Sequence, residues 1–131
     1  MSSLVVPIHT RWGDMDVFHH INNVAYVRYL EDARAYFLEQ AGLRAMADDF
    51  GHIVVRHEID FLRQMEYRIE PYDMELWVDS RAAASYVLGY ELRDHDDIYM
   101  RAKTSMVCLN MRTGKPTRLP DDYLALLQSL E

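Results

Sequence analysis

A single long helix is predicted by residues 22–41, NNVAYVRYLEDARAYFLEQA. Asparagine is a preferred helix N-cap, because its side-chain oxygen can accept an unpaired amide N–H of the first turn, so Asn22 and Asn23 mark the start. Apolar residues then recur at spacings of four and three, at Tyr26, Leu30, Ala33, Phe37 and Ala41. Gly42 is a stop signal. The result is one apolar stripe along a helix roughly 28 Å long.

The residues after this helix predict strands joined by turns. Apolar and charged residues alternate in the first strand, which places on one face Ile53, Val55, His57, Ile59 and Phe61. One predicted strand precedes the helix, at residues 5–12. The others follow it at 52–62, 72–84, 85–93 and 98–110, and a final helix lies at 120–130. This order predicts an α+β fold with a helix against one face of an antiparallel sheet. Trp77 and Tyr90 are expected on the outer face, so we expect pairing with another copy of the chain.

Composition limits the function classes. A length of 131 residues predicts one domain, residues 1–131. The formal net charge of −7 disfavours a nucleic-acid partner, which needs a basic surface. The single cysteine, Cys108, cannot form an internal disulfide or a multi-cysteine zinc site. No signal peptide and no stretch near the ~20 apolar residues of a membrane span is evident, so a cytoplasmic protein is expected.

Polar side chains are densest just before the long helix, in RWGDMDVFHHINN, residues 11–23. The first amides of a helix point their N–H groups outward at its partly positive end, where they can polarise a carbonyl oxygen. A carboxylate beside them could attack that carbonyl or activate water. These are the parts needed for acyl transfer to water. The alternative is that the aspartates only shape a turn, and for Asp14 this structural role is expected.

The same residues resemble a known family. Residues 11–16, 20–26 and 29–34 follow the pattern D-x-D, three residues, H-[hydrophobic]-N-N, then a helix with E-x-A-R. This pattern resembles the signature of hotdog-fold acyl-CoA thioesterases of the 4-hydroxybenzoyl-CoA thioesterase type. The resemblance continues through residues 58–63, ends near residues 114–116 and so covers most of the chain. It implies a hotdog fold, in which a five- or six-stranded antiparallel sheet wraps a long central helix. It also implies a homodimer, paired edge to edge with sites at the interface, or a tetramer.

The resemblance also implies site residues. Asp16 matches the catalytic aspartate, a nucleophile or general base, and the backbone N–H of Asn23 matches the amide that polarises the thioester carbonyl. His20 matches a histidine that orients the carbonyl or holds the loop, and Asn22 is expected to cap the helix. Asn22 and Tyr26 at the helix start, and Arg63 near the CoA phosphates, are expected to contact substrate.

The substrate implied is an acyl-CoA or an acyl-carrier thioester. CoA then enters as part of the substrate, with no separate cofactor and no metal. Four other cations lie on or near strands that would flank the site and are also candidates for CoA phosphates: Arg56, Arg68, Arg101 and Lys103. Two rival functions remain open, a non-catalytic acyl-thioester binding module and a hotdog hydratase or dehydratase.

Three features depart from the family pattern. Many relatives carry glycine where this chain has His19, and proline where it has Gln64. The segment at residues 65–71 is longer than the common loop. Among residues without a motif, His57 and Cys108 are expected to be structural.

Overall fold

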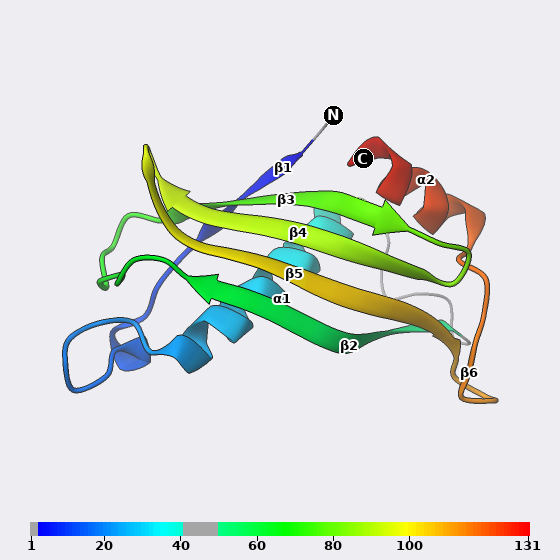
Figure 1. The fold of residues 1–131 in the computed structure, drawn as a ribbon, viewed down its shortest axis with the longest axis horizontal. Coiled ribbons are helices and arrows are strands. Elements are labelled where there is room, and N and C mark those ends of the chain that lie inside the picture. The colour runs from blue at the N-terminus through cyan, green and yellow to red at the C-terminus, as the bar shows by residue number, and fades with distance from the viewer. Residues whose placement is uncertain (1–2, 41–49) are drawn as a thin grey trace.

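The computed structural model describes residues 3–40 and 50–131 (Figure 1), so Ala41 and Gly42 of the helix prediction lie outside the described residues. The elements are β1 (Leu4–Ile8), the short 3₁₀ helix η1 (Trp12–Asp14), α1 (Asn23–Gln40), β2 (Phe50–Phe61), β3 (Tyr72–Arg81), β4 (Ser85–Asp94), β5 (Asp97–Asn110), β6 (Lys115–Pro116) and α2 (Asp121–Ser129). The strands form one antiparallel sheet of six in the order β1-β3-β4-β5-β2, with β6 paired to β5. The predicted α+β class and antiparallel sheet are therefore confirmed.

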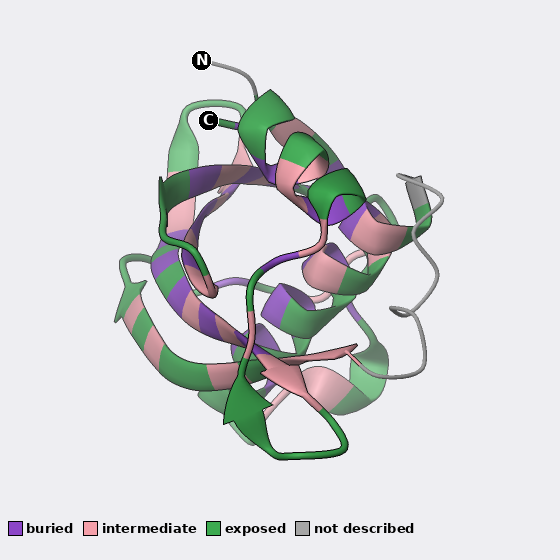
Figure 2. Ribbon diagram, turned by 90° about the vertical axis from the view of Figure 1, so that its right-hand side faces the viewer, coloured by how far each residue is buried: buried purple, intermediate pink, exposed green. Residues whose placement is uncertain are grey.

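The helix α1 runs across one face of the sheet, as Figure 1 shows. Its predicted stripe is buried at Tyr26, Leu30, Ala33 and Phe37. Buried positions alternate with exposed ones along the strands in Figure 2, and the core lies between the curved sheet and the helices. Within the described residues no helix is both long and apolar enough to cross a membrane.

The alternation predicted for the first half of β2 is wrong. The register of β2 against β5 shifts between Val54 and Arg56, so Val55 is the extra residue of a β-bulge. Because a shift of one residue moves side chains to the opposite face, Val54 packs against the core, whereas Ile53 and Val55 are 38% and 60% exposed. After the bulge the prediction is confirmed: His57 and Ile59 are partly buried, and Glu58 and Asp60 are exposed on the other face.

The predicted position of Tyr90 is also wrong. Tyr90 lies opposite Leu76 in the β3–β4 register, and both side chains are buried on the inner face. A guanidinium nitrogen of Arg34 donates a hydrogen bond of 3.3 Å to the Tyr90 hydroxyl, which links α1 to the sheet. Trp77 has the opposite orientation: it lies so close to Gly89 that a Cβ there would come within 2.4 Å of its Cε2 atom.

Candidate active site

The loop between η1 and α1 is a tight hairpin. Met15 and Ile21 form an isolated antiparallel bridge, and the amide of Asp16 donates to the carbonyl of His20 at 2.8 Å. His19 at the tip has φ of 62°, a left-handed conformation that favours glycine. Glycine adopts this φ freely, so the backbone at position 19 is of the kind that suits glycine. The exposed His19 is not among the residues that line the cavity described below.

Backbone amides hold the carboxylate of Asp16. Its Oδ1 accepts N–H groups from Phe18 at 2.9 Å and from His20 at 3.4 Å. The side chain is half-buried. Within the described part of the chain no hydrogen bond engages the second oxygen, Oδ2. The loop thus fixes one oxygen of the carboxylate and leaves the other available for chemistry.

The start of α1 lies directly after this hairpin. The side-chain Oδ1 of Asn22 accepts the Val24 amide at 2.8 Å, and its carbonyl accepts the Ala25 amide at 2.9 Å, so Asn22 is the N-cap, as predicted. Asn23 is the first helical residue. Its amide N–H has no carbonyl acceptor within the helix and lies at the partly positive helix end.

A cavity of about 240 Å³ collects most of the predicted site residues. It is lined by Asp16, His20, Asn23, Tyr26 and Arg63, together with Phe18, Ile21, Phe61, Leu62 and Gln64. Asn22 is absent from this lining and borders a separate cavity of about 500 Å³ beside Arg11 and Arg28. The structure therefore brings five of the six predicted site residues to one cavity. Asn22 caps α1 but does not line this cavity.

Asp14 has the structural role expected of it. Its Oδ2 accepts a hydrogen bond of 2.7 Å from the Tyr29 hydroxyl, and its carbonyl accepts the Asn22 amide at 2.9 Å. Burial, and then the bond to Asp14, raises the pKa of Tyr29. Asp14 therefore joins η1 to α1 and is not among the residues lining the Asp16 cavity.

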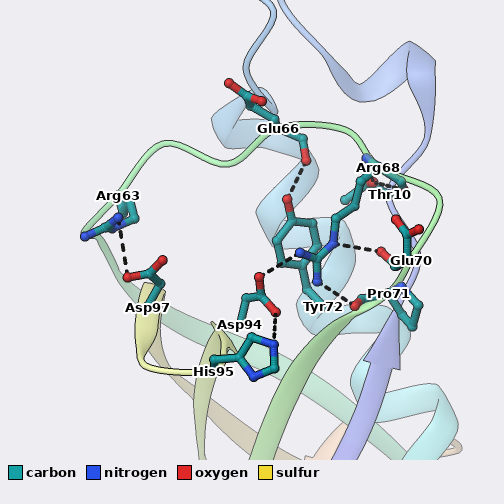
Figure 3. A network of polar contacts seen from close by, with 10 residues as sticks. All are labelled: Thr10, Arg63, Glu66, Arg68, Glu70, Pro71, Tyr72, Asp94, His95 and Asp97. Carbon is teal, nitrogen blue, oxygen red and sulfur yellow. Dashed lines mark hydrogen bonds and ion pairs between the residues drawn. The ribbon is translucent and has the colours of Figure 1, made fainter.

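A second loop, residues 62–71, braces the hairpin, and sequence reasoning did not identify its role. The carbonyl of Met65 accepts the Ile21 amide at 2.7 Å, two residues before Asn23. Arg68 holds this loop in the network of Figure 3: its guanidinium donates to Asp94 at 2.7 Å and to the carbonyls of Glu70 and Pro71 at 3.0 and 2.8 Å. The guanidinium carbon also lies 3.8 Å from the centroid of the Tyr72 ring. The only sequence signal for this brace was the unusual length of residues 65–71.

Arg68→Met should lower the thermal midpoint by on the order of 5 °C, because two loop carbonyls and one carboxylate lose a charge-assisted donor. Arg68 lowers the pKa of Asp94, so this stabilisation is present above the usual aspartate pKa of about 3.9 and is lost as pH falls through the lower folded value. Thermal melts of the wild type and of Arg68→Met should therefore differ in midpoint at neutral pH, and this difference should be smaller at about pH 3.

Arg56→Met is the matched control, because the ion pair of Arg56 with Glu58 is exposed on both sides and should contribute little. Equal midpoint changes in the two variants at neutral pH would contradict a bracing role for Arg68.

The cations proposed for CoA phosphates are dispersed. Arg63 alone among them lines the Asp16 cavity, where its side chain is 58% exposed and lies 3.4 Å from Asp97. Each of the other four pairs with an acid: Arg56 with Glu58, Arg68 with Asp94, Arg101 with Glu91 and Lys103 with Asp79. Arg63 is therefore the cation best placed at the cavity.

The residues expected to be structural have that role. His57 Nδ1 lies 2.9 Å from the Thr104 hydroxyl, and burial, aided by Arg34, lowers the pKa of His57. Cys108 is buried, and burial raises the pKa of its thiol, which does not suit a nucleophile. In the described ranges no three His, Cys, Asp or Glu side chains come together as a metal site would require.

Solved structures with the same fold are numerous. The PA2801 protein from Pseudomonas aeruginosa, a proposed thioesterase, is 27% identical with a TM-score of 0.82, covering 94% of this chain and 95% of its own. The 1,4-dihydroxy-2-naphthoyl-CoA thioesterase Slr0204 from Synechocystis is 18% identical with a TM-score of 0.89, covering 98% of both chains. The PA5185 protein from Pseudomonas aeruginosa is 24% identical with a TM-score of 0.88, covering 98% of this chain and 91% of its own. The last two similarities concern the fold alone.

Comparison with curated proteins gives no match. The thioesterase-like superfamily, in contrast, matches residues 10–127, which include the hairpin, α1 and the whole Asp16 cavity. A match over this much of the chain establishes the family: the protein belongs to the thioesterase-like superfamily.

Proposed function

We propose that this protein is an acyl-CoA thioesterase of the 4-hydroxybenzoyl-CoA thioesterase type, which converts an acyl-CoA and water to a free carboxylic acid and CoA. Membership of the thioesterase-like superfamily supports thioester hydrolysis in general. The observation that carries the finer proposal is one cavity lined by both Asp16 and Asn23, the first residue of α1. We further propose that residues 1–131 act as one hotdog domain, with α1 as its central helix, and need no cofactor or metal.

In the proposed mechanism the thioester carbonyl oxygen accepts the N–H of Asn23. Asp16 then acts in one of two ways: its carboxylate attacks the carbonyl carbon to give an anhydride that water hydrolyses, or it removes a proton from an attacking water. The C–S bond breaks in either case, and CoA leaves as a thiolate that takes up a proton. A thiol pKa of about 8.5 makes this departure easy without a strong acid.

The remaining site residues are proposed to position substrate. Tyr26 is buried and packs edge-on against Phe61 at 5.2 Å between ring centroids, which gives the cavity an apolar wall for the acyl group. Arg63 at the exposed rim is proposed to meet a CoA phosphate. His20 is proposed to hold the hairpin, since its backbone contacts Asp16 twice, and to orient the carbonyl.

We propose that the working unit is a homodimer or a tetramer. The strand β2 forms a free edge of the described sheet, and its Ile53, Val55 and Phe61 side chains are 38%, 60% and 46% exposed. The site hairpin adds Val17 and Phe18, 86% and 74% exposed. Burying such an edge and its apolar side chains favours self-association. Sedimentation should give a mass at least about twice the 15.4 kDa of one chain; a monomer at micromolar concentration would contradict the proposal.

Thiol release from a panel of thioesters tests the proposed activity. The panel contains aliphatic acyl-CoAs of increasing length, aromatic acyl-CoAs and an acyl-carrier thioester. Hydrolysis of the aliphatic or the aromatic acyl-CoAs supports the proposal. Preference for the acyl-carrier thioester would mean that the substrate is a carrier-linked acyl group and not an acyl-CoA. Saturable binding without hydrolysis would identify a binding module, whereas addition of water to a 2-enoyl thioester without thiol release would identify a hydratase.

A further inference from the structure

A second cavity, of about 280 Å³, lies between α1, the inner face of the sheet and α2. It shares no lining residue with the Asp16 cavity. Part of its wall is apolar and is formed by Leu38, Val54, Leu88 and Met106. The polar part of the wall is formed by Arg34, His52, Tyr86 and Tyr123, and no step of the proposed mechanism uses these residues.

Arg34 brings a positive charge to this cavity without an acidic partner. Its guanidinium donates a hydrogen bond of 3.3 Å to the Tyr90 hydroxyl. Among the described residues this is its one hydrogen bond, and no carboxylate oxygen lies within 4.0 Å of its nitrogens. The residue is half-buried. A half-buried charge without an opposite charge is unfavourable, so an anion bound beside Arg34 would stabilise it.

The other three polar residues form one hydrogen-bonded cluster. His52 Nδ1 lies 2.9 Å from the Tyr86 hydroxyl, which lies 2.8 Å from the Tyr123 hydroxyl. The second ring nitrogen, His52 Nε2, is buried without a hydrogen-bond partner. Burial lowers the pKa of His52 to about 4, so the ring is neutral at pH 7 and carries one N–H.

Counting protons shows that this cluster has a spare donor. Its members carry three N–H or O–H protons: one on His52, one on Tyr86 and one on Tyr123. Only two hydrogen bonds join them, so one proton is unused whichever tautomer His52 adopts. The part of the chain that the structure describes offers no further acceptor for it. The cluster therefore suits a ligand oxygen that accepts a hydrogen bond.

The strand β4 sets the distance between Arg34 and the cluster. Tyr86, Leu88 and Tyr90 are alternate residues of β4, and all three are buried on its inner face. Tyr86 belongs to the cluster, whereas Tyr90 accepts the hydrogen bond of Arg34. Four residues of a strand span about 13 Å. A chain of about six carbons is roughly 8 Å long, so it bridges this span with one hydrogen bond at each end.

We propose that this cavity binds a short hydroxy acid, whose carboxylate contacts the Arg34 guanidinium and whose hydroxyl oxygen accepts the spare proton of the cluster. A guanidinium presents its N–H groups in a fork that matches a carboxylate. The apolar part of the wall contacts the methylene chain. Glu31 is the one acid among the lining residues, and it is exposed and more than 4.0 Å from the Arg34 nitrogens. The inference goes beyond the proposed thioesterase function and does not depend on it.

Titration of the wild type with 6-hydroxyhexanoate at neutral pH, followed by nuclear magnetic resonance of the His52 ring, tests the site. The ring signals should shift saturably as the acid binds. Hexanoate should bind about two- to tenfold more weakly, the range expected for one hydrogen bond to a neutral partner. The uncharged 6-hydroxyhexanamide should bind at least about tenfold more weakly, because it lacks the charge that pairs with Arg34.

Arg34→Met should weaken binding of 6-hydroxyhexanoate by at least about tenfold as well. Methionine has a similar length and removes an unpaired charge, so the variant should fold, which thermal melts verify. The comparison of acid with amide tests the same contact in the wild type if it does not. Arg28→Met is the matched control, because Arg28 lies on the same helix but is exposed and does not border this cavity. It should bind the acid as the wild type does.

Three results in the wild type would overturn the inference: no saturable shift of the His52 signals, equal affinity for the acid and the amide, or equal affinity for hexanoate and 6-hydroxyhexanoate. Wild-type affinity in folded Arg34→Met would do the same. Binding that is lost in Arg63→Met and kept in Arg34→Met would place the acid in the Asp16 cavity instead. None of these results bears on thioester hydrolysis, which the panel of thioesters tests separately.

Discussion

Asp16→Asn should reduce kcat for acyl-CoA hydrolysis by about 10²–10⁴-fold, the usual contribution of a positioned catalytic base. The amide has nearly the shape of the carboxylate, and its oxygen can still accept the Phe18 N–H that holds the wild-type side chain at 2.9 Å. The hairpin should therefore persist while the negative charge that attacks the carbonyl or activates water is lost. KM should change much less than kcat, because Asp16 acts on the reacting atoms. Steady-state kinetics on the best substrate of the panel measures both.

Asp14→Asn is the informative comparison, because Asp14 is the other carboxylate of the D-x-D pair. Its carboxylate oxygen Oδ2 accepts a hydrogen bond from the Tyr29 hydroxyl at 2.7 Å, and Oδ1 lies 3.4 Å from the Arg11 guanidinium. Loss of the Asp14 charge should therefore lower stability more than kcat. A thermal melt and a kinetic assay on both variants separate the two roles. If Asp16→Asn kept wild-type kcat while Asp14→Asn lost it, the catalytic assignment would move to Asp14.

The candidate site was largely predictable because it is local in sequence. Asp16 and Asn23 are seven positions apart, and one hairpin followed by an N-cap is enough to bring them to one cavity. The stripe of α1 was predictable for the same reason, since a 3.6-residue period depends on the helix alone. Asn22 shows the limit of this reasoning. Its capping role is local and was predicted, but the sequence did not indicate that Asn22 borders the cavity beside Arg11 and Arg28 and not the Asp16 cavity.

Features that depend on register were not predictable from one strand at a time. The bulge at Val55 is visible only in the pairing of β2 with β5, and it moves Ile53 from the expected face. Tyr90 was misplaced because its face depends on its pairing with Leu76 across β3. Both errors come from cross-strand contacts that the alternation within one strand does not contain.

Contacts between distant segments were equally hidden. The bonds between Thr10 and Arg68 join residues 58 positions apart, and they help to hold the loop that braces the hairpin. His52, Tyr86 and Tyr123 come from β2, β4 and α2, and none of them had a motif. Only the folded chain shows that two hydrogen bonds join these three residues.

Asn23→Pro should lower kcat by about 10²–10³-fold, the usual cost of losing one donor to a developing oxyanion. Proline lacks the backbone N–H, and the first helical position is the one where proline is tolerated and even preferred. Asn23 holds that position, directly after the N-cap Asn22. The substitution therefore removes the proposed carbonyl donor and leaves the intrahelical hydrogen bonds of α1 unchanged, which circular dichroism and thermal melts would verify.

Asn23→Ala supplies the matched control for this experiment, because it removes the side chain and keeps the backbone N–H. If the amide polarises the carbonyl, Asn23→Ala retains most of kcat and Asn23→Pro does not, while both bind substrate with similar KM. If the two variants lost kcat equally, the side chain of Asn23 would be the active group. If both variants kept the wild-type kcat, a donor other than Asn23 would have to polarise the thioester carbonyl, because the negative charge of Asp16 cannot donate a hydrogen bond to its oxygen. The pair of variants thus separates the backbone from the side chain at the one position where the hairpin, the helix end and the cavity meet.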